Sequence, residues 1–154
     1  MTTTVEDRLS GIGVALPAPA RSVANYKPYV LTGNLLFTSG QLPIRDGVFT
    51  ATGKLGDELD ITAGQEAARW CAANILAQAK DALGDLEKIK RLIKITVFVA
   101  STHAFTDQHQ VANGASDFLV EALGEAGNHS RSAVGVPSLP MDVPVEIEAV
   151  FEIH

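Results

Sequence analysis

The sequence is poor in the features that mark secreted and membrane-spanning proteins. It contains one cysteine, Cys71, so no disulfide can form within the chain, which fits a reducing compartment. No apolar run approaches the length that crosses a bilayer, and the start at Met1 lacks the basic residues and apolar stretch of a signal peptide. We therefore expect a cytoplasmic protein that is not bound to a membrane.

Residues that typically bind metals are also scarce. The four histidines are His103, His109, His129 and His154, and the first two lack the i, i+4 spacing of a helical metal pair. Sequence signatures of phosphate-binding loops, dinucleotide sites, zinc proteases and serine hydrolases are missing. We predict no metal and no cofactor, and we place Cys71 in the core because it lies on an apolar helical stripe.

The sequence also has few positively charged residues. Twelve lysines and arginines stand against 18 acidic residues, which gives a formal net charge of -6 and a sequence pI of about 5.1. An acidic surface repels phosphate backbones, so nucleic-acid binding is disfavoured.

The composition that remains is that of an ordinary globular domain. The chain has 154 residues, of which 46% are hydrophobic and 19% charged. Residues 1–28 are rich in Gly, Pro, Ser and Ala and are interpreted as an irregular leader with room for one short turn of helix. Residues 29–154 are predicted to form a single domain.

Hydrophobic periodicity predicts the elements of this domain. Thr62 and Gln65 are spaced as a capping box before a helical apolar stripe that ends at Gly84. A second helix is expected over about 104–123, ended by Gly124. The predicted strands are 29–31, 35–39, 48–50, 92–100, 133–137 and 145–153.

The order β-β-β-α-β-α-β-β indicates an α+β two-layer sandwich, a mixed sheet with two helices on one face. The last strand alternates, with apolar residues such as Val145 and Ile147 on one side and Glu146, Glu148 and Glu152 on the other. We expect the helices to cover the apolar side, leaving the carboxylates to face solvent or a partner subunit.

Arg131 and Glu146 are the candidate catalytic pair. They lie at the starts of the last two predicted strands and would converge if those strands were adjacent and antiparallel. An arginine beside a cleft binds a carboxylate through two parallel hydrogen bonds, and a nearby glutamate deprotonates a water molecule. An ordinary cross-strand salt bridge between the two residues is the competing interpretation.

Several blocks occur in an order that resembles the YjgF/Rid family, the reactive-imine deaminases, from about Tyr29 to Ile153. A longer leader also resembles the branch described as YjgF/chorismate-mutase-like, often labelled endoribonuclease L-PSP. The blocks are Tyr29-Val-Leu, Leu36-Phe-Thr-Ser39-Gly-Gln41-Leu-Pro43, Val97-Phe-Val-Ala, Phe105, Val111-Ala-Asn113, Arg131-Ser-Ala-Val, Leu139-Pro140 and Val145-Glu146-Ile-Glu148-Ala.

The resemblance implies a chorismate-mutase-like fold and a homotrimer whose sheets form a central barrel, with ligand clefts between subunits. It implies that Arg131 binds the substrate carboxylate, that Glu146 orders the hydrolytic water, and that Tyr29, Ser39 and Asn113 line the cleft. The implied reaction is hydrolysis of a reactive enamine or imine, such as 2-aminoacrylate, to a 2-keto acid and ammonia, without a cofactor.

The sequence departs from the deaminase pattern at two places in the expected cleft. Ala133 stands where many deaminases carry a cysteine, and the segment 101–110, with His103 and His109, is longer. A non-catalytic trimer that binds small carboxylates is therefore a second hypothesis. An endoribonuclease, as the family label suggests, is a third hypothesis, which the acidic net charge disfavours.

Overall fold

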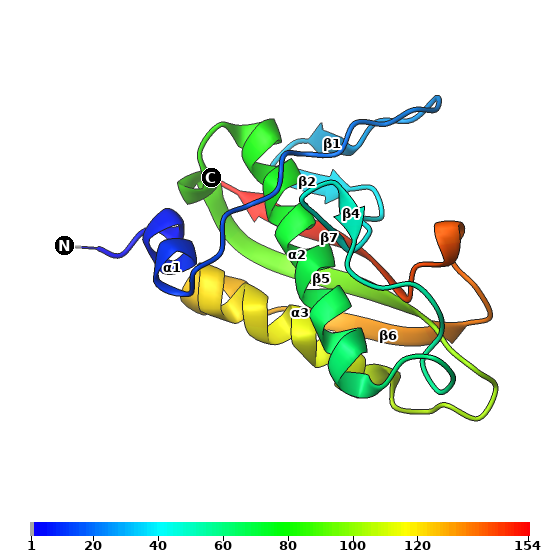
Figure 1. Ribbon diagram of the computed structural model, residues 1–154. Helices are drawn as coiled ribbons and strands as arrows, with labels where there is room; N and C mark the ends of the chain where they lie inside the picture. The colour runs from blue at the N-terminus through cyan, green and yellow to red at the C-terminus, as the bar shows by residue number, and fades with distance from the viewer. Residues whose placement is uncertain (1) are drawn as a thin grey trace.

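A five-stranded mixed sheet forms one layer of the structure, and two long helices cover one of its faces (Figure 1). The computed structural model describes residues 2–154. The helices are α1 (Val5–Gly11), α2 (Ile61–Leu83) and α3 (Gln108–Leu123), with short 3₁₀ turns η1 (Leu86–Lys88), η2 (Gly124–Gly127) and η3 (Pro140–Asp142). The strands are β1 (Tyr29–Thr32), β2 (Leu35–Thr38), β3 (Ile44–Arg45), β4 (Val48–Phe49), β5 (Ile89–Ala100), β6 (Ser130–Val136) and β7 (Val145–Ile153).

The strand order of the main sheet is β1-β2-β7-β5-β6. Only β5 and β6 run parallel, and the other neighbouring pairs are antiparallel. The predicted α+β sandwich is confirmed. The segment 48–50 was expected as a third strand of this sheet, but β4 instead pairs with β3 in a separate two-stranded ribbon.

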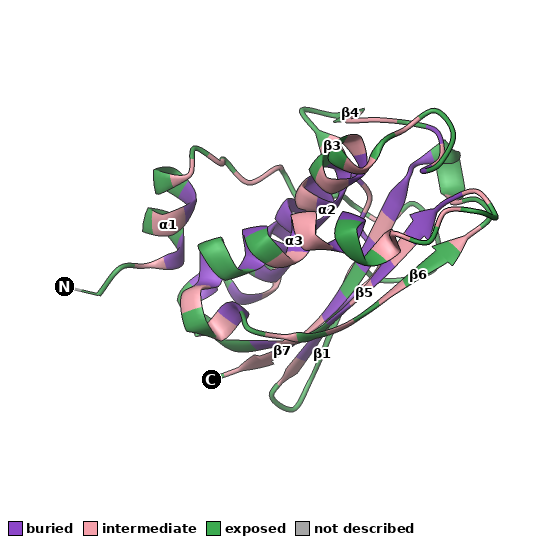
Figure 2. Ribbon diagram, turned by 90° about the horizontal axis from the view of Figure 1, so that it is seen from below, coloured by how far each residue is buried: buried purple, intermediate pink, exposed green. Residues whose placement is uncertain are grey.

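The strict alternation of β7 fixes which face of the sheet is covered. Val145, Ile147 and Phe151 are buried under the helices, as predicted, while Glu148 is exposed on the opposite face. That opposite face also carries Val30, and no helix of residues 2–154 covers it. The buried residues gather where the helices meet the sheet, whereas β6 is exposed or half-buried along its length (Figure 2).

Both long helices begin at other residues than the sequence predicts. α2 begins at Ile61 because Asp60 caps it, accepting a hydrogen bond from the amide of Ala63 at 2.8 Å, so the predicted Thr62–Gln65 capping box does not form. Gly84 ends this helix as expected, with φ of 79°. α3 starts four residues later than predicted, since a turn from Thr102 to Phe105 precedes it.

The leader is less irregular than predicted. Residues 5–11 form α1, whose first turn is closed by a reciprocal capping box between Thr4 and Asp7, and this helix packs on α3. The chain then crosses over α2 on its way to β1 (Figure 1). No helix among the described residues combines the length and the apolar character needed to traverse a bilayer.

The two long helices cross at a glycine. A Cβ atom on Gly114 of α3 would lie 2.1 Å from the main-chain oxygen of Gln65 in α2, so only glycine permits this approach. The Gln65 side chain fixes the crossing further by donating to the carbonyl of Gln110 at 2.9 Å. This contact sets the position of the whole inner face of α3, including Asn113.

Gly114→Ala should therefore destabilise the fold by about 1–3 kcal/mol, the usual cost of overpacking against a rigid neighbour. Gly11→Ala is the matched control, because nothing lies within 4 Å of the position its Cβ would take. Urea denaturation of both variants measures the difference. Equal stability of the two variants would contradict the close crossing.

Candidate functional site

Arg131 lies on the edge strand β6, on the face that the helices cover. Its Nη1 donates to Asn113 Oδ1 at 2.9 Å and to Ser116 Oγ at 3.0 Å, and its Nη2 donates to the carbonyl of His109 at 3.0 Å. Three neutral acceptors from α3 thus fix a half-buried guanidinium. Within residues 2–154, the Nε–H and one Nη2–H have no acceptor, and Nε and Nη2 share the edge through which a carboxylate binds bidentately.

A second layer holds Ser116 in place. The His129 ring lies between Ser116 and Gly127, with 2.9 Å from Nε2 to Ser116 Oγ and 2.6 Å from Nδ1 to the Gly127 carbonyl. Because the carbonyl only accepts, Nδ1 carries the proton, which leaves Nε2 to accept from the Ser116 hydroxyl. From the sequence, His129 is interpreted as a loop histidine on the surface, with tuning of the pocket through its neighbour Arg131 as the alternative, and Ser116 is not identified. The only sequence signal for Ser116 is its i, i+3 spacing from Asn113 on α3.

Arg131 has no acidic partner within the described chain. No carboxylate of residues 2–154 lies within 4.0 Å of its guanidinium nitrogens, and the ion pairs that do form involve other residues. The competing interpretation, a cross-strand salt bridge between Arg131 and Glu146, is therefore wrong. An arginine fixed by neutral groups keeps its full charge available for an external anion.

Strand order explains why the two residues do not meet. β5 lies between β6 and β7, so the expected adjacency of the last two strands is wrong. In register, Arg131 stands beside Ile95 and Glu146 beside Phe98. Side chains alternate along a strand, so positions 95 and 98 point to opposite faces. Within one chain, Arg131 and Glu146 are thus on opposite sides of the sheet.

Glu146 occupies a half-buried position on the uncovered face. Its carboxylate lies against Gly40, where a Cβ atom would be only 2.1 Å from Glu146 Oε2. Burial raises the pKa of Glu146 above the ordinary carboxyl value, and the negative charge of Glu148 raises it further. A carboxylate whose pKa is raised is a stronger base than an ordinary carboxylate, which suits it to take a proton from water.

Ser39 and Tyr29 lie on the β1–β2 side of the sheet, near Gly40 but away from Arg131. Ser39 Oγ donates to the carbonyl of Lys27 at 2.6 Å, which holds the end of the leader. The Tyr29 hydroxyl donates to Asp81 at 2.9 Å, and this hydrogen bond raises the pKa of Tyr29. Of the five predicted site residues, only Arg131 and Asn113 contact each other within one chain.

The remaining sequence candidates lie outside these two groups. His103 is exposed, and His109 contributes its main-chain carbonyl to Arg131 rather than its ring. Cys71 is fully buried, as expected, and burial raises the pKa of its thiol well above the usual range. Within residues 2–154, no group of three or more His, Cys, Asp or Glu side chains is placed to hold a metal ion.

The raised pKa of Glu146 has a testable consequence for stability. The folded state binds the Glu146 proton more tightly than the unfolded state, so the ionised carboxylate costs stability. That cost is absent below the ordinary carboxyl pKa of about 4.3, and it grows as pH rises through the folded-state value. Glu146→Gln should therefore be more stable than the wild type at pH 8 and equally stable near pH 4.

Denaturation at fixed protein concentration across this pH range measures the difference. Glu121→Gln, which replaces an exposed carboxylate on α3, is the control for a general charge effect. A constant difference between Glu146→Gln and wild type at all pH values would contradict the assignment.

Comparison with known proteins places this arrangement in a family context. A sequence profile described as "YjgF/chorismate_mutase-like, putative endoribonuclease" matches residues 6–151. Protein TCP17 of Trypanosoma cruzi is 46% identical over 151 residues, which cover 97% of this chain and 94% of that protein. A crystal structure of a protein with unknown function from Agrobacterium tumefaciens is similar at 50% identity with a TM-score of 0.92, covering 97% of this chain and 92% of that one.

A more distant relative carries a functional name. The protein named "Putative reactive intermediate deaminase TdcF" from Escherichia coli is 32% identical over 132 residues, covering 84% of this chain and 87% of that protein. The crystal structure of E. coli TdcF with bound serine is similar at 28% identity with a TM-score of 0.64, covering 92% of this chain and 97% of that one. The fold and the family are therefore shared over most of the chain.

Proposed function

The chain belongs to the YjgF/chorismate-mutase-like family, and from this premise we propose that it hydrolyses small enamines or imines that carry a carboxylate. The products are a 2-keto acid and ammonia, and 2-aminoacrylate is the simplest substrate of this class. The observation that carries the proposal is the guanidinium of Arg131, fixed by three neutral acceptors and without an acidic partner in residues 2–154.

Binding is the first step. The substrate carboxylate takes the two donors left on the Nε–Nη2 edge of Arg131, and each charged hydrogen bond contributes about 1.5–3 kcal/mol. Asn113, Ser116 and His129 position the guanidinium before the substrate arrives, so little ordering is lost on binding. A relative named as a deaminase and crystallised with serine, itself a carboxylate, supports this choice of ligand.

Hydrolysis is the second step. 2-Aminoacrylate first takes up a proton from solvent at C3, which gives the iminium tautomer. Water attacks C2 of the iminium, the Glu146 carboxylate takes one proton from that water, and a neutral carbinolamine forms. Glu146 returns this proton to the amino nitrogen, the C–N bond breaks and ammonia leaves, while the hydroxyl proton passes to the Glu146 carboxylate as the C=O bond forms and from there to solvent. The substrate is intrinsically reactive, so holding it beside an oriented water supplies most of the acceleration. None of these steps uses a cofactor.

The two halves of the site must come from different chains. Arg131 and Asn113 lie on β6 and α3, whereas Glu146, Gly40 and Ser39 lie three strands away or on the opposite face. Neighbouring strands are about 4.8 Å apart, so β2 and β6 are separated by about 14 Å. A homotrimer that sets the edge strand β6 of one chain beside the β2–β7 side of another would bring Arg131 toward Glu146 and Ser39.

The uncovered face fits such an assembly. Val30, Phe37 and Val134 project from it with exposed fractions of 51%, 41% and 44%. Apolar side chains on a sheet face gain free energy when a partner covers them. We propose a cytoplasmic homotrimer with clefts between subunits, which binds no nucleic acid.

Release of ammonia and pyruvate from enzymatically generated 2-aminoacrylate tests the proposal. We expect wild type to accelerate the release and Arg131→Ala to lower kcat/KM about a hundredfold, the loss of one or two charged hydrogen bonds. Lys80→Ala is the matched control, because Lys80 lies in the helix layer in an exposed ion pair with Glu6, away from the proposed cleft, and its loss should leave activity unchanged.

The alternative functions give different outcomes in the same experiment. Thermal stabilisation by pyruvate without turnover by wild type would favour the carboxylate-binding hypothesis. RNA cleavage that survives purification and depends on Arg131 would favour the endoribonuclease. Equal turnover by wild type and Arg131→Ala would exclude Arg131 as the carboxylate-binding group.

A further inference from the structure

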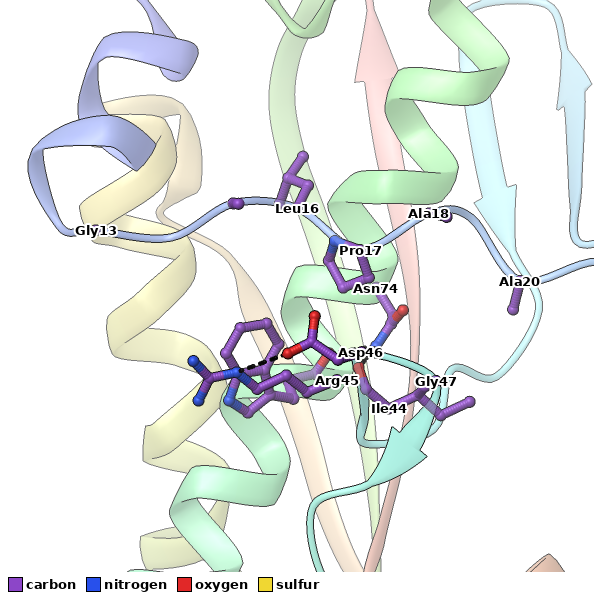
Figure 3. A pocket seen from close by; sticks show the side chains of 12 residues that line it. Gly13, Leu16, Pro17, Ala18, Ala20, Ile44, Arg45, Asp46, Gly47 and Asn74 are labelled. Carbon is purple, nitrogen blue, oxygen red and sulfur yellow. Dashed lines mark hydrogen bonds and ion pairs between the residues drawn. The ribbon is translucent and has the colours of Figure 1, made fainter.

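A cavity of about 520 Å³ lies on the helix side of the molecule, between the leader and the β3–β4 ribbon (Figure 3). The leader segment 13–20 forms one wall, and Trp70 and Asn74 of α2 form the floor. Arg131 and Glu146 do not line it. Its size is that of a small-molecule site rather than of a packing defect.

Asn74 at the floor is a buried amide with an unused acceptor. Its residue is 3% exposed, and Nδ2 donates to the carbonyls of Leu42, Ile44 and Trp70 at 3.2, 2.9 and 2.8 Å. Exchange of the amide nitrogen and oxygen would set Oδ1 against three carbonyl oxygens, so this orientation is fixed. Oδ1 accepts no hydrogen bond from residues 2–154, and Asn74 is one of the residues that line the cavity.

A pair of opposite charges stands at the mouth. Arg45 Nε lies 3.8 Å from Asp46 Oδ2, and its guanidinium stacks over the Trp70 ring at 4.7 Å from the centroid. Asp46 is held at the ribbon turn with φ of 53°, a conformation that Asn also adopts readily. Figure 3 shows the side chains of Asp46 and Asn74 projecting beneath Leu16 and Pro17.

We propose that this cavity binds an apolar α-amino acid. The ligand ammonium donates to Asn74 Oδ1 and to the Asp46 carboxylate, and its carboxylate accepts from Arg45. The zwitterion thus lies antiparallel to the Arg45–Asp46 pair, with each charge facing its opposite. The ligand side chain packs on Trp70 and the apolar leader wall.

Arg45, Asp46 and Asn74 together favour a ligand that carries both an ammonium and a carboxylate group. A primary amine alone would face the cation of Arg45 without a compensating carboxylate. A carboxylic acid alone would offer no donor to the Asn74 oxygen and would make one hydrogen bond fewer than an amino acid. Only a ligand with both groups on adjacent atoms satisfies all three side chains.

Isothermal titration calorimetry of the full chain with L-leucine tests the proposal, and 3-methylbutylamine and 4-methylpentanoate serve as half-ligands. We expect saturable binding of leucine and at least tenfold weaker binding of either half-ligand. Asp46→Asn, which keeps the turn conformation, should weaken leucine binding at least tenfold. Asp57→Asn, another exposed aspartate outside the cavity, should bind as wild type does.

The Arg131→Ala variant distinguishes this cavity from the proposed catalytic site. It should bind leucine with the same affinity as the wild type. Loss of leucine binding in Arg131→Ala, or unchanged binding in Asp46→Asn, would overturn the assignment to this cavity. Binding of 3-methylbutylamine as tight as that of leucine would overturn the role of Arg45. Absence of any leucine binding would overturn the proposal and leave the deaminase proposal intact, because neither Arg45, Asp46 nor Asn74 acts in it.

Discussion

The position of β5 between β6 and β7 is the constraint on which the site depends. It places Arg131 and Glu146 on strands that never touch, and the alternation of side chains then sends them to opposite faces. Within one chain, neither residue can neutralise the other. Arg131 keeps a positive charge that no carboxylate of residues 2–154 pairs with, and Glu146 keeps a raised pKa on the uncovered face. A salt bridge between Arg131 and Glu146 would have neutralised that charge and lowered that pKa.

The helix layer holds the guanidinium of Arg131 in place through neutral groups. The close crossing at Gly114 sets α3 against α2, which fixes where Asn113 and Ser116 meet the edge strand. His129 adds the second layer by orienting the Ser116 hydroxyl. Because the three groups that accept from the guanidinium are neutral, an anion that approaches it breaks no ion pair of residues 2–154. Packing between helices thus governs the chemistry of a strand residue.

Local patterns in the sequence predict local structure well here. The bounds of β7 follow from its alternation, and Gly84 marks the end of α2. The spacing of Thr4 and Asp7 is a signal for α1 that the Gly- and Pro-rich composition of the leader obscures. The start of α2 is mispredicted because Asp60 and Thr62 are both good caps, and only tertiary packing selects between them.

Hydrophobic periodicity does not determine the order of strands in a sheet. The same alternating residues in β6 and β7 are compatible with adjacent strands or with β5 between them, so the sequence predicts the site residues without their partners. Arg131 and Asn113 were both identified and do meet. Ser116 was missed, because a serine on a helix carries no signal until the fold brings it to Arg131. His129 was considered for its place two residues before Arg131, but its partner Ser116 follows only from the fold.

The central claim is that a complete site needs Arg131 from one chain and Glu146 from another. Mixed oligomers of Arg131→Ala and Glu146→Gln, formed by co-expression and verified by native mass spectrometry, test it most directly. Each variant alone should be inactive toward 2-aminoacrylate, whereas random mixing restores about one site in four if the halves come from different chains. Mixed oligomers that form but regain no activity would contradict the account, as would a protein that stays monomeric while active.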